Sequence, residues 1–420
     1  MTYVKRTVGL GSGESYPPFS EMNLCPVDGR PVQLEIDTER LNAEKPDQSW
    51  YSPERPNMWR FGGLMGLDWD NPEDRKSIVS LGEGHTPLLE CSDWDIAKKA
   101  NINLKLKEEG HPVSGFGRNP TGSFKDRGMS FVASAAKKLG LTKLSVPTQG
   151  NAGDSLTSYA LEAGFEVVVA MPDDTPMPIM GKVAALAKIH PQIHLELVQG
   201  TIREAGALLK EKYAPQGFFN VATFQEPGWR IEGKKTLGLE IAEPEKGGNK
   251  WKLPDVILYP TGGGTGVLGM WKAFAELEQL GLVGPERPKV ICVQSEVTSP
   301  VVTAFEAGAE DTEVVQAGST MATGLNVPGG VGHFKVLDII KSSKGAALSV
   351  SEKYMGETLT EVYRKYGWWI SPEGAACFAA LDQALEKSLI SSGDSVVMFN
   401  TGSIEKYLPD VRHLVETEAR

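Results

Sequence analysis

The sequence predicts an α/β protein with two doubly wound open-sheet domains and an irregular N-terminal extension. Apolar runs of strand length alternate with helix-length segments from about residue 140 onward, and glycine-rich segments follow several of these runs. Strands that are apolar along their whole length are typical of parallel sheets covered by helices on both faces. The 420 residues are enough for roughly two or three structural units.

The alternating region contains two series of elements. In the first series we expect strands at residues 143–146, 166–171 and 194–198 and helices at residues 152–163, 180–188 and 202–212. In the second series we expect strands at residues 256–259, 290–293 and 395–399 and helices at residues 267–280, 300–307, 352–366 and 373–389. Active sites in such sheets lie beyond the carboxyl ends of the strands, so the loops that follow the strands are the candidates for chemistry.

Residues 1–78 do not show this alternation, and they contain Pro17, Pro18 and a polar segment at residues 44–50. We therefore expect an irregular extension that packs on the main body. The segment 25–29 resembles half of a zinc knuckle, but Asp28 stands where the second cysteine would be. Because a structural zinc site needs four ligands, a turn is favoured there and no metal is expected.

The composition excludes several classes of protein. Lys and Arg total 43 against 54 Asp and Glu, which gives a net charge of −11 and disfavours nucleic acid as a partner. Four scattered cysteines are too few for a disulfide framework, so a reducing, cytoplasmic location is expected. No apolar run approaches the roughly 18 to 20 residues that span a bilayer, so no membrane insertion is expected.

Three loops that follow predicted strands share a glycine-rich or small polar character: residues 149–153, 261–266 and 400–403. In the second loop, four glycines allow successive backbone N–H groups to converge on one anion at the start of the next helix. This pattern predicts a phosphate cradle, with a plain flexible turn as the alternative. Neither a Walker motif nor a dinucleotide-binding Gly-x-Gly-x-x-Gly fingerprint is present.

The segment 119–128 contains a lysine in a distinctive position. Ser123 and Asp126 have the spacing of a helix capping box, and residues 129–139 continue a helical pattern. Lys125 then lies in the first helical turn, where the positive end of the helix disfavours its charge. An amine with a lowered pKa suits Schiff-base chemistry, whereas a solvated surface lysine is the alternative interpretation.

Five segments, at residues 119–128, 150–153, 230–236, 261–266 and 400–403, together resemble the threonine synthase family. These are pyridoxal-phosphate enzymes of the tryptophan-synthase-β type, and the resemblance extends from roughly residue 80 onward. It implies two α/β domains with the cofactor in the cleft. The implied domains are an extension at residues 1–78, a large cofactor-binding domain at residues 79–112 and 223–420, and a small mobile domain at residues 113–222.

The resemblance implies a site for pyridoxal 5′-phosphate. Lys125 would form a Schiff base with the cofactor and then move protons at the substrate's α and β carbons. Asn151 would hydrogen-bond the 3′ oxygen of the cofactor, and Thr401 would meet its pyridine nitrogen with a neutral hydroxyl. The residues implied for its phosphate are Gly262, Gly263, Gly264, Thr265 and Gly266.

The resemblance also implies a substrate, O-phospho-L-homoserine, which is converted with water to L-threonine and phosphate by γ-elimination and β-hydration. Arg230 matches the arginine that binds the substrate phosphate in the family. An arginine suits this role because a guanidinium binds phosphate bidentately. The alternative for Arg230 is a helix-surface ion pair with Glu226 or Glu240. The remaining substrate-binding candidates are Thr148, Gln149 and Ala152 for the carboxylate, with Lys182 and Thr223 as further contacts. The resemblance also implies a homodimer, which is the usual assembly in this family.

Two departures from the family pattern bear on the substrate. Gln149 replaces a shorter hydroxyl residue, and Ile404 with Glu405 stands where Gly-Leu is common. We expect that Ile404 alters the loop shape, because it does not easily adopt left-handed backbone angles. The alternative functions are a dehydratase or β-replacement enzyme of the same cofactor class and a non-catalytic carrier. His85 is expected to be structural.

Overall fold

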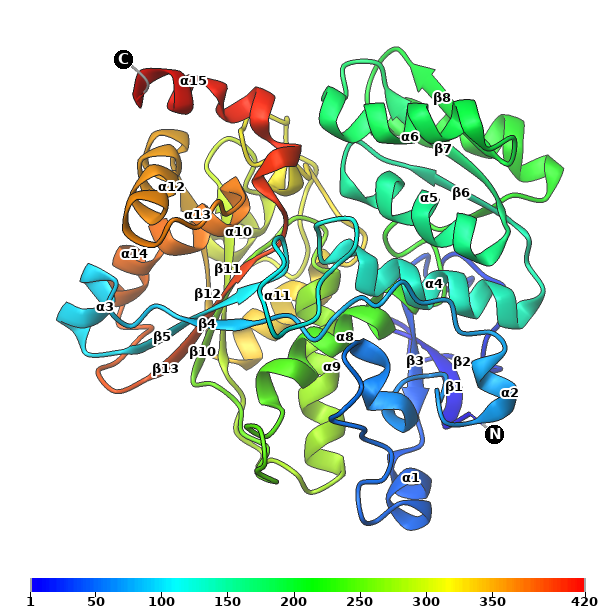
Figure 1. Cartoon of the computed structure of the whole chain (residues 1–420), viewed down its shortest axis with the longest axis horizontal. Coiled ribbons are helices and arrows are strands. Elements are labelled where there is room, and N and C mark those ends of the chain that lie inside the picture. The colour runs from blue at the N-terminus through cyan, green and yellow to red at the C-terminus, as the bar shows by residue number, and fades with distance from the viewer. Residues whose placement is uncertain (1, 419–420) are drawn as a thin grey trace. The chain divides into compact units, whose positions relative to one another are not determined.

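The computed structural model describes residues 2–418 (Figure 1), and the chain divides into two compact units. Unit 1 comprises Met1–Gly84 and Asn119–Thr236, and unit 2 comprises His85–Arg118 and Leu237–Arg420. These limits differ from the domain boundaries expected from the sequence, which remain a prediction. The difference arises because the first 84 residues group with residues 119–236.

The main sheet of unit 1 is parallel, with the strand order β8-β7-β6-β9. Its strands are β6 (Lys143–Pro147), β7 (Glu166–Pro172), β8 (Ile193–Val198) and β9 (Phe219–Asn220). The helices of this part are α4 (Lys125–Leu139), α5 (Asn151–Ala163), α6 (Met177–Ile189), α7 (Ile202–Leu208), η2 (Leu209–Tyr213) and η3 (Ala214–Gln216). Helix α8 (Trp229–Ala242) begins in unit 1 and ends in unit 2. Figure 1 shows α5 and α6 lying over this sheet. The predicted parallel arrangement is confirmed by the pairing of these strands, and β7 is buried along all but its first residue, as is typical of a covered parallel sheet.

The N-terminal part of unit 1 is more regular than the sequence analysis predicted. It forms a three-stranded antiparallel sheet with the order β2-β1-β3, from β1 (Val4–Gly9), β2 (Ser15–Tyr16) and β3 (Val32–Ile36). Short helices follow, namely α1 (Thr38–Glu44), η1 (Met58–Leu64) and α2 (Pro72–Arg75). The expectation of an irregular extension is therefore wrong for this part. Alternating burial along β3 matches the apolar and polar alternation of its residues, which is the signal of a half-buried strand.

A buried carboxylate ties the N-terminal segment to the helices of unit 1. The Glu83 carboxylate accepts hydrogen bonds from Trp59 Nε1 (2.9 Å), Ser130 Oγ on α4 (2.6 Å) and Tyr159 Oη on α5 (2.8 Å). Burial raises the pKa of Glu83, and the donors around it oppose that effect. Donors from three separate segments therefore meet at one side chain.

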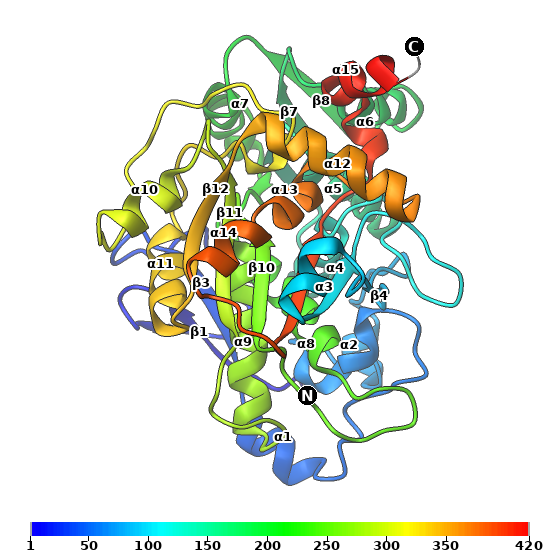
Figure 2. The ribbon, with the colours of Figure 1, turned by 90° about the vertical axis from the view of Figure 1, so that its left-hand side faces the viewer.

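Unit 2 contains a six-stranded sheet with the order β12-β11-β10-β13-β5-β4. Its strands are β4 (Leu88–Glu90), β5 (Asn103–Glu108), β10 (Val256–Pro260), β11 (Lys289–Ser295), β12 (Ala346–Val350) and β13 (Ser395–Asn400). All neighbours pair in parallel except β4, which is antiparallel to β5. The helices are α3 (Asp95–Ala100), α9 (Thr265–Gln279), α10 (Pro300–Glu306), η4 (Thr323–Leu325), α11 (His333–Ser342), α12 (Glu352–Tyr366), α13 (Pro372–Ala379), α14 (Leu381–Glu386), η5 (Ile404–Lys406) and α15 (Leu408–Glu418). Figure 2 looks onto the face that α13 and α14 cover.

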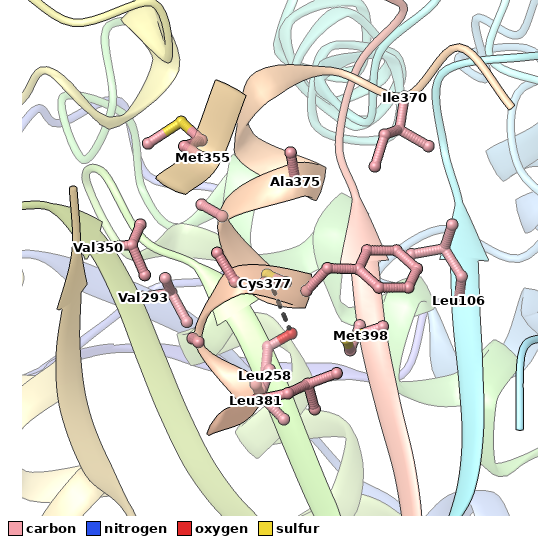
Figure 3. Close-up of a cluster of buried hydrophobic side chains, with 14 of the residues drawn as sticks. Leu106, Leu258, Val293, Val350, Met355, Ile370, Ala375, Cys377, Leu381 and Met398 are labelled. Atoms are coloured by element: carbon pink, nitrogen blue, oxygen red, sulfur yellow. Dashed lines mark hydrogen bonds between the residues drawn. The ribbon is translucent and has the colours of Figure 1, made fainter. Parts of the chain in front are cut away.

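The core of unit 2 lies between this sheet and α13 (Figure 3). Strand residues Leu258, Val293 and Met398 pack against the small side chains of α13. Cys377 on α13 is fully buried and its Sγ lies 3.7 Å from the Leu258 carbonyl oxygen. Because burial raises the pKa of the Cys377 thiol, this cysteine is a packing residue and not a nucleophile.

Several elements differ from the sequence-based expectation. The helix predicted at residues 202–212 ends at Leu208 and continues as a π-helical turn, and the helix predicted at residues 373–389 is broken into α13 and α14. Strand β12 and helix α11 were missed. Two alanines and a serine within β12 weaken its strand signal, because small residues have low strand propensity.

Candidate active site

Helix α4 begins at Lys125, which therefore lies in the first turn as the sequence predicts, but the start of the helix is built differently. The helix is preceded by Phe124, and no side chain of the described residues caps it. The Lys125 side chain is half-buried, and its Nζ lies 4.5 Å from the centroid of the Phe124 ring. The alternative of a fully solvated surface lysine is therefore wrong.

The predicted capping box at Ser123 and Asp126 is also wrong. The Asp126 carboxylate instead accepts hydrogen bonds from the Thr121 backbone N–H (2.7 Å), the Thr121 hydroxyl (2.6 Å) and the Ser155 hydroxyl (2.6 Å). Ser155 lies on α5, so Asp126 joins the start of α4 to the neighbouring helix. The short polar side chains of this segment fix the loop before Lys125 and leave the helix N–H groups without a side-chain cap among residues 2–418.

The loop before α5 has the form expected of an anion-binding turn. The Thr148 hydroxyl accepts a hydrogen bond from the Gly150 N–H at 3.0 Å, and α5 starts at Asn151 with no side-chain cap from the described residues. A Cβ at Gly153 would lie 2.7 Å from Thr148 Cγ2, so glycine allows the loop to pack closely. Thr148, Asn151 and Ala152 are brought together around this helix start, which favours a carboxylate.

Two predicted substrate contacts lie outside this arrangement. Gln149 is exposed, and its Nε2 lies 3.4 Å from Asp174 Oδ1. Lys182 on α6 is partly exposed and forms an ion pair with Asp154 on α5. Both side chains therefore have protein partners of their own.

Arg230 lies on α8 and is 2% exposed, so the alternative of a helix-surface ion pair is wrong. Its guanidinium donates to the Thr223 hydroxyl at 3.0 Å and to the Val221 carbonyl oxygen. Glu226 accepts from the Arg230 backbone N–H at 3.2 Å. Within residues 2–418, Arg230 Nε has no hydrogen-bond partner, and it is buried. One donor of a buried cation is thus left for a ligand.

Glu240, the other suggested partner of Arg230, has a different role in unit 2. It forms a buried ion pair with Lys107 at 2.7 Å and accepts a hydrogen bond from the His85 backbone N–H at 2.6 Å. His85 has a φ of 52°, which the hydrogen bond to its own backbone helps to hold. The position of His85 in a fixed turn agrees with its expected structural role.

Sequence reasoning missed Lys234, which lies one helical turn after Arg230 on α8. Lys234 is 1% exposed, and its Nζ lies 4.6 Å from the centroid of the Phe124 ring. Burial, followed by the charges of Lys125 and Arg230, lowers the pKa of Lys234 well below its usual range. We call Lys125, Glu226, Arg230 and Lys234 the unit 1 charge cluster. The signal was present in the sequence, because residues four apart share one face of a helix.

Glu226 is the acidic member of the cluster. Burial raises the pKa of Glu226 to about 8, although the charges of Arg230 and Lys234 oppose the shift. Its carboxyl group is therefore mostly protonated at neutral pH. Its Oε2 is buried without a hydrogen-bond partner in the described part of the chain.

The glycine-rich loop of unit 2 lies between β10 and α9. Gly264 has a φ of 87° and precedes the helix, and no side chain among the described residues caps the first N–H groups of α9. A Cβ at Gly262 would lie 2.5 Å from the Gly324 carbonyl oxygen, and one at Gly266 would collide with Tyr259 Oη. The loop thus needs its glycines, and the uncapped N–H groups at a helix start fit a phosphate group.

His333, on α11, holds this loop and was not found from the sequence. Its Nε2 lies 2.9 Å from the Gly262 carbonyl oxygen and its Nδ1 lies 3.0 Å from the Thr312 hydroxyl. Burial lowers the pKa of His333, so the ring is neutral at physiological pH. The carbonyl of Gly262 is thereby turned toward the histidine, which fixes the direction of the neighbouring peptide.

Thr401 follows β13 and is buried. The Asn400 side chain donates to both oxygens of Glu108, at 2.7 and 2.9 Å, and accepts from the Ser371 hydroxyl at 2.9 Å. These contacts fix the backbone on which Thr401 lies. A neutral hydroxyl at this position fits the neutral pyridine nitrogen of the cofactor expected from the sequence.

The departure from the family pattern after Thr401 is accommodated without strain. Ile404 begins the 3₁₀ turn η5 and does not have a positive φ. The Glu405 carboxylate lies 3.2 Å from His111 Nε2, and the Ser403 hydroxyl lies 3.3 Å from the same nitrogen. Although burial opposes it, hydrogen bonds with Glu108 and Glu405 raise the pKa of His111. The loop after Thr401 therefore continues as a short helical turn.

Two kinds of site are not indicated. Among residues 2–418, no group of three or more His, Cys, Asp or Glu residues is arranged to hold a metal ion. None of the helices described here has the length and apolar character needed to cross a membrane.

Comparison with known proteins identifies the family of this arrangement. The family model described as pyridoxal-phosphate dependent enzyme matches residues 79–402. A threonine synthase of Methanocaldococcus jannaschii is 31% identical over 350 residues, covering 82% of this chain and 79% of that protein. A threonine synthase of Methanosarcina acetivorans is 31% identical over 374 residues, covering 89% of this chain and 83% of that protein.

Solved structures show the same fold. A diaminopropionate ammonia lyase from Escherichia coli superimposes with a TM-score of 0.65 at 16% identity and covers 88% of this chain and 96% of its own. A threonine deaminase from Solanum lycopersicum has a TM-score of 0.62 at 20% identity, with 79% and 88% of the two chains covered. The tryptophan-synthase-β-like architecture expected from the sequence is thus confirmed.

Proposed function

Because the chain belongs to the family of pyridoxal-phosphate-dependent enzymes, we propose that it converts O-phospho-L-homoserine and water into L-threonine and phosphate. The observation that carries this proposal is the buried Arg230. Its guanidinium donates a hydrogen bond to the Thr223 hydroxyl, and its Nε has no protein partner among residues 2–418. A buried guanidinium of this kind suits a phosphate ester better than a neutral hydroxyl. The similarity to threonine synthases over most of the chain supports the same substrate.

We propose the following residues for the cofactor site. Lys125 provides the amine that attaches pyridoxal phosphate, and Asn151 hydrogen-bonds its 3′ oxygen. The loop at residues 262–266 binds its phosphate through backbone N–H groups at the start of α9, and Thr401 meets the ring nitrogen. When bound, the cofactor stabilises negative charge that develops at the substrate's reacting carbons.

The other residues bind and orient the substrate. Thr148, Ala152 and the uncapped start of α5 receive the carboxylate, since helix N–H groups favour an anion. Arg230 and Thr223 bind the phosphate that leaves from the γ-carbon. Lys125 moves the protons at the α and β carbons. Gln149 and Lys182 remain predicted substrate contacts. Their side chains interact with Asp174 and Asp154, and these interactions do not support a role in binding the substrate.

The experiment supplies the purified protein with pyridoxal phosphate and O-phospho-L-homoserine and measures threonine and inorganic phosphate in the same samples. We expect equal amounts of both products, and we expect that Arg230→Ala abolishes most of the turnover. Phosphate or keto acid without threonine would contradict the proposal and favour the related dehydratases or β-replacement enzymes. An Arg230→Ala variant that still turned over serine or threonine would also contradict the proposal and favour the related dehydratases or β-replacement enzymes.

We further propose a cytoplasmic homodimer that does not bind nucleic acid. The four cysteines are all free and buried, which suits a reducing compartment, and the net charge of −11 disfavours a phosphate backbone. Sedimentation of the purified protein tests the dimer, and a monomer across all concentrations would contradict it.

A further inference from the structure

Glu226 is a buried acid with one oxygen that the fold does not use. It lies just before α8 and is 0% exposed. Its Oε1 accepts a hydrogen bond from the Arg230 backbone N–H at 3.2 Å, whereas its Oε2 has no hydrogen-bond partner among residues 2–418. A buried polar atom without a partner costs free energy, and such atoms are found where a group is kept for catalysis. The second oxygen is therefore available to a ligand.

The turn that carries Glu226 is held in place from both sides. Phe224, two residues earlier, is buried and has a φ of 65°, which a bulky side chain rarely adopts. Gly228, two residues later, has a φ of 75°, and a Cβ there would lie 2.5 Å from Gln33 Cα on β3. A backbone of this kind persists only where the surrounding structure fixes it. The Glu226 carboxyl group therefore has a defined position beside Arg230.

The unit 1 charge cluster brings this acid together with a cation. Burial raises the pKa of Glu226 to about 8, and the charges of Arg230 and Lys234 oppose the shift, so the carboxyl group mostly keeps its proton at neutral pH. The Arg230 guanidinium donates to the Thr223 hydroxyl at 3.0 Å, and its buried Nε has no partner within the described part of the chain. A group that binds an anion thus lies next to a group that donates a proton.

Departure of phosphate from a carbon atom calls for such a proton. A phosphate monoester is mainly dianionic at neutral pH. When the bond between the γ-carbon and the ester oxygen breaks, its electron pair stays on the oxygen. Without a proton the leaving group would be a trianion, which is a strong base. Protonation of that oxygen gives the hydrogen phosphate dianion instead, and an acid with a pKa near the working pH suits this transfer.

We propose that Glu226 is the general acid that protonates the leaving phosphate while Arg230 binds it. The inference rests on the proposed function, because it assumes a phosphorylated amino acid as the substrate. The proton passes from the Glu226 carboxyl group to the ester oxygen as the carbon–oxygen bond breaks. Hydrogen phosphate leaves, and the Glu226 carboxylate takes a proton from water before the next turnover.

A purely structural role is the alternative, since Glu226 Oε1 accepts from an N–H group in the first turn of α8 as a capping side chain does. Glu226→Gln separates the two roles. Its amide oxygen still accepts from the Arg230 N–H, and its amide nitrogen still donates a hydrogen bond to a phosphate oxygen. An amide does not transfer a proton, so only the catalytic step is lost.

The test compares two esters with the enzyme loaded with pyridoxal phosphate. O-phospho-L-homoserine and O-sulfo-L-homoserine have leaving groups of the same tetrahedral shape, but sulfate is a weak base and leaves without a proton. We expect Glu226→Gln to lower kcat for the phosphate ester about 100-fold or more, with KM little changed, and to keep nearly the wild-type kcat for the sulfate ester. Glu162→Gln is the matched control, because Glu162 is exposed near the end of α5, away from the cluster.

A second readout needs only the phosphate ester. In wild type, kcat should fall as the pH rises above about 8, because Glu226 loses its proton there. In Glu226→Gln this fall should be absent, whereas the control should keep it. Thermal unfolding checks that each variant is folded.

The outcomes separate this inference from the proposed function. A wild-type enzyme that makes no threonine overturns the proposed function and the inference with it. If wild type makes threonine, the inference alone is overturned by a Glu226→Gln variant that is as fast as wild type, that loses rate equally on both esters, or that keeps the wild-type pH profile.

Discussion

The groups proposed for function differ in kind between the two units. In unit 1 the proposed groups are titratable side chains, namely Lys125, Glu226, Arg230 and Lys234, and burial shifts the pKa of the last three. In unit 2 they are backbone N–H groups at the start of α9 and a neutral hydroxyl, supported by a neutral histidine. Side-chain charges change during a reaction, whereas backbone dipoles stay fixed.

This difference suggests a division of labour. In the proposed function, unit 2 anchors a phosphate group that does not react, because fixed dipoles need no rearrangement as charge develops nearby. In the proposed function, unit 1 instead binds and moves charge, because its candidate groups are lysine and arginine side chains. Substitutions in the two units should therefore fail in different ways.

The largest effect is expected for Lys125→Ala. Loss of the amine that attaches the cofactor and moves protons should lower turnover of O-phospho-L-homoserine by about a thousandfold or more. Threonine release is measured, and folding is checked by thermal unfolding. Lys137→Ala on the same helix is the control. If the Lys125 variant turned over substrate as fast as the control, unit 1 would not carry the chemistry.

A smaller effect is expected for Gly264→Ala in unit 2. An added Cβ lies 2.4 Å from Val336 Cγ2, and the residue has a φ of 87°, which costs about 1–2 kcal/mol for alanine. We expect about tenfold weaker binding of pyridoxal phosphate, measured by titration. Gly281→Ala is the matched control, since its φ is 70° and no described atom lies within 4 Å of its added Cβ. Equal cofactor affinity in the two variants would show that the backbone loop is not the anchor.

The smallest effect is a pH dependence from Glu226. Burial raises its pKa to about 8 in the folded protein, so between the unfolded value of about 4.3 and about 8 only the folded state keeps the proton. The contribution of Glu226 to stability is thus complete below that window and is lost as the pH rises through it. Glu226→Gln should raise the melting temperature relative to wild type by more at about pH 8 than at about pH 5. A constant difference at both pH values would contradict this assignment.

Much of the fold could be predicted because its signals are local. The apolar strand β7 and the helix Glu352–Tyr366 were found from the pattern of apolar residues, and Lys125 lies in the first turn of α4 as expected. The glycine-rich loops could be located because a turn of that shape demands glycine. The antiparallel strand β4 could not be found in this way, since three residues carry too little pattern.

The electrostatics of the site could be predicted less well than the fold. Ser123 and Asp126 have the spacing of a capping box, but Asp126 has stronger partners in Thr121 and Ser155. That competition depends on α5, which lies about 30 residues further along the chain. Lys234 has the correct spacing from Arg230, but only the close approach of α4 and α8 shows that both are buried.

The hydrogen bonds of the Glu83 carboxylate bear on how far the chain can be truncated from its N-terminus. The family model begins at residue 79, so a gene trimmed to that limit would keep Glu83 and Ser130 but discard Trp59. It would leave the buried acid with one donor fewer and would remove the indole that stacks on Phe131 of α4. The limit of the family model therefore leaves out contacts that hold the N-terminal segment to the helices of unit 1.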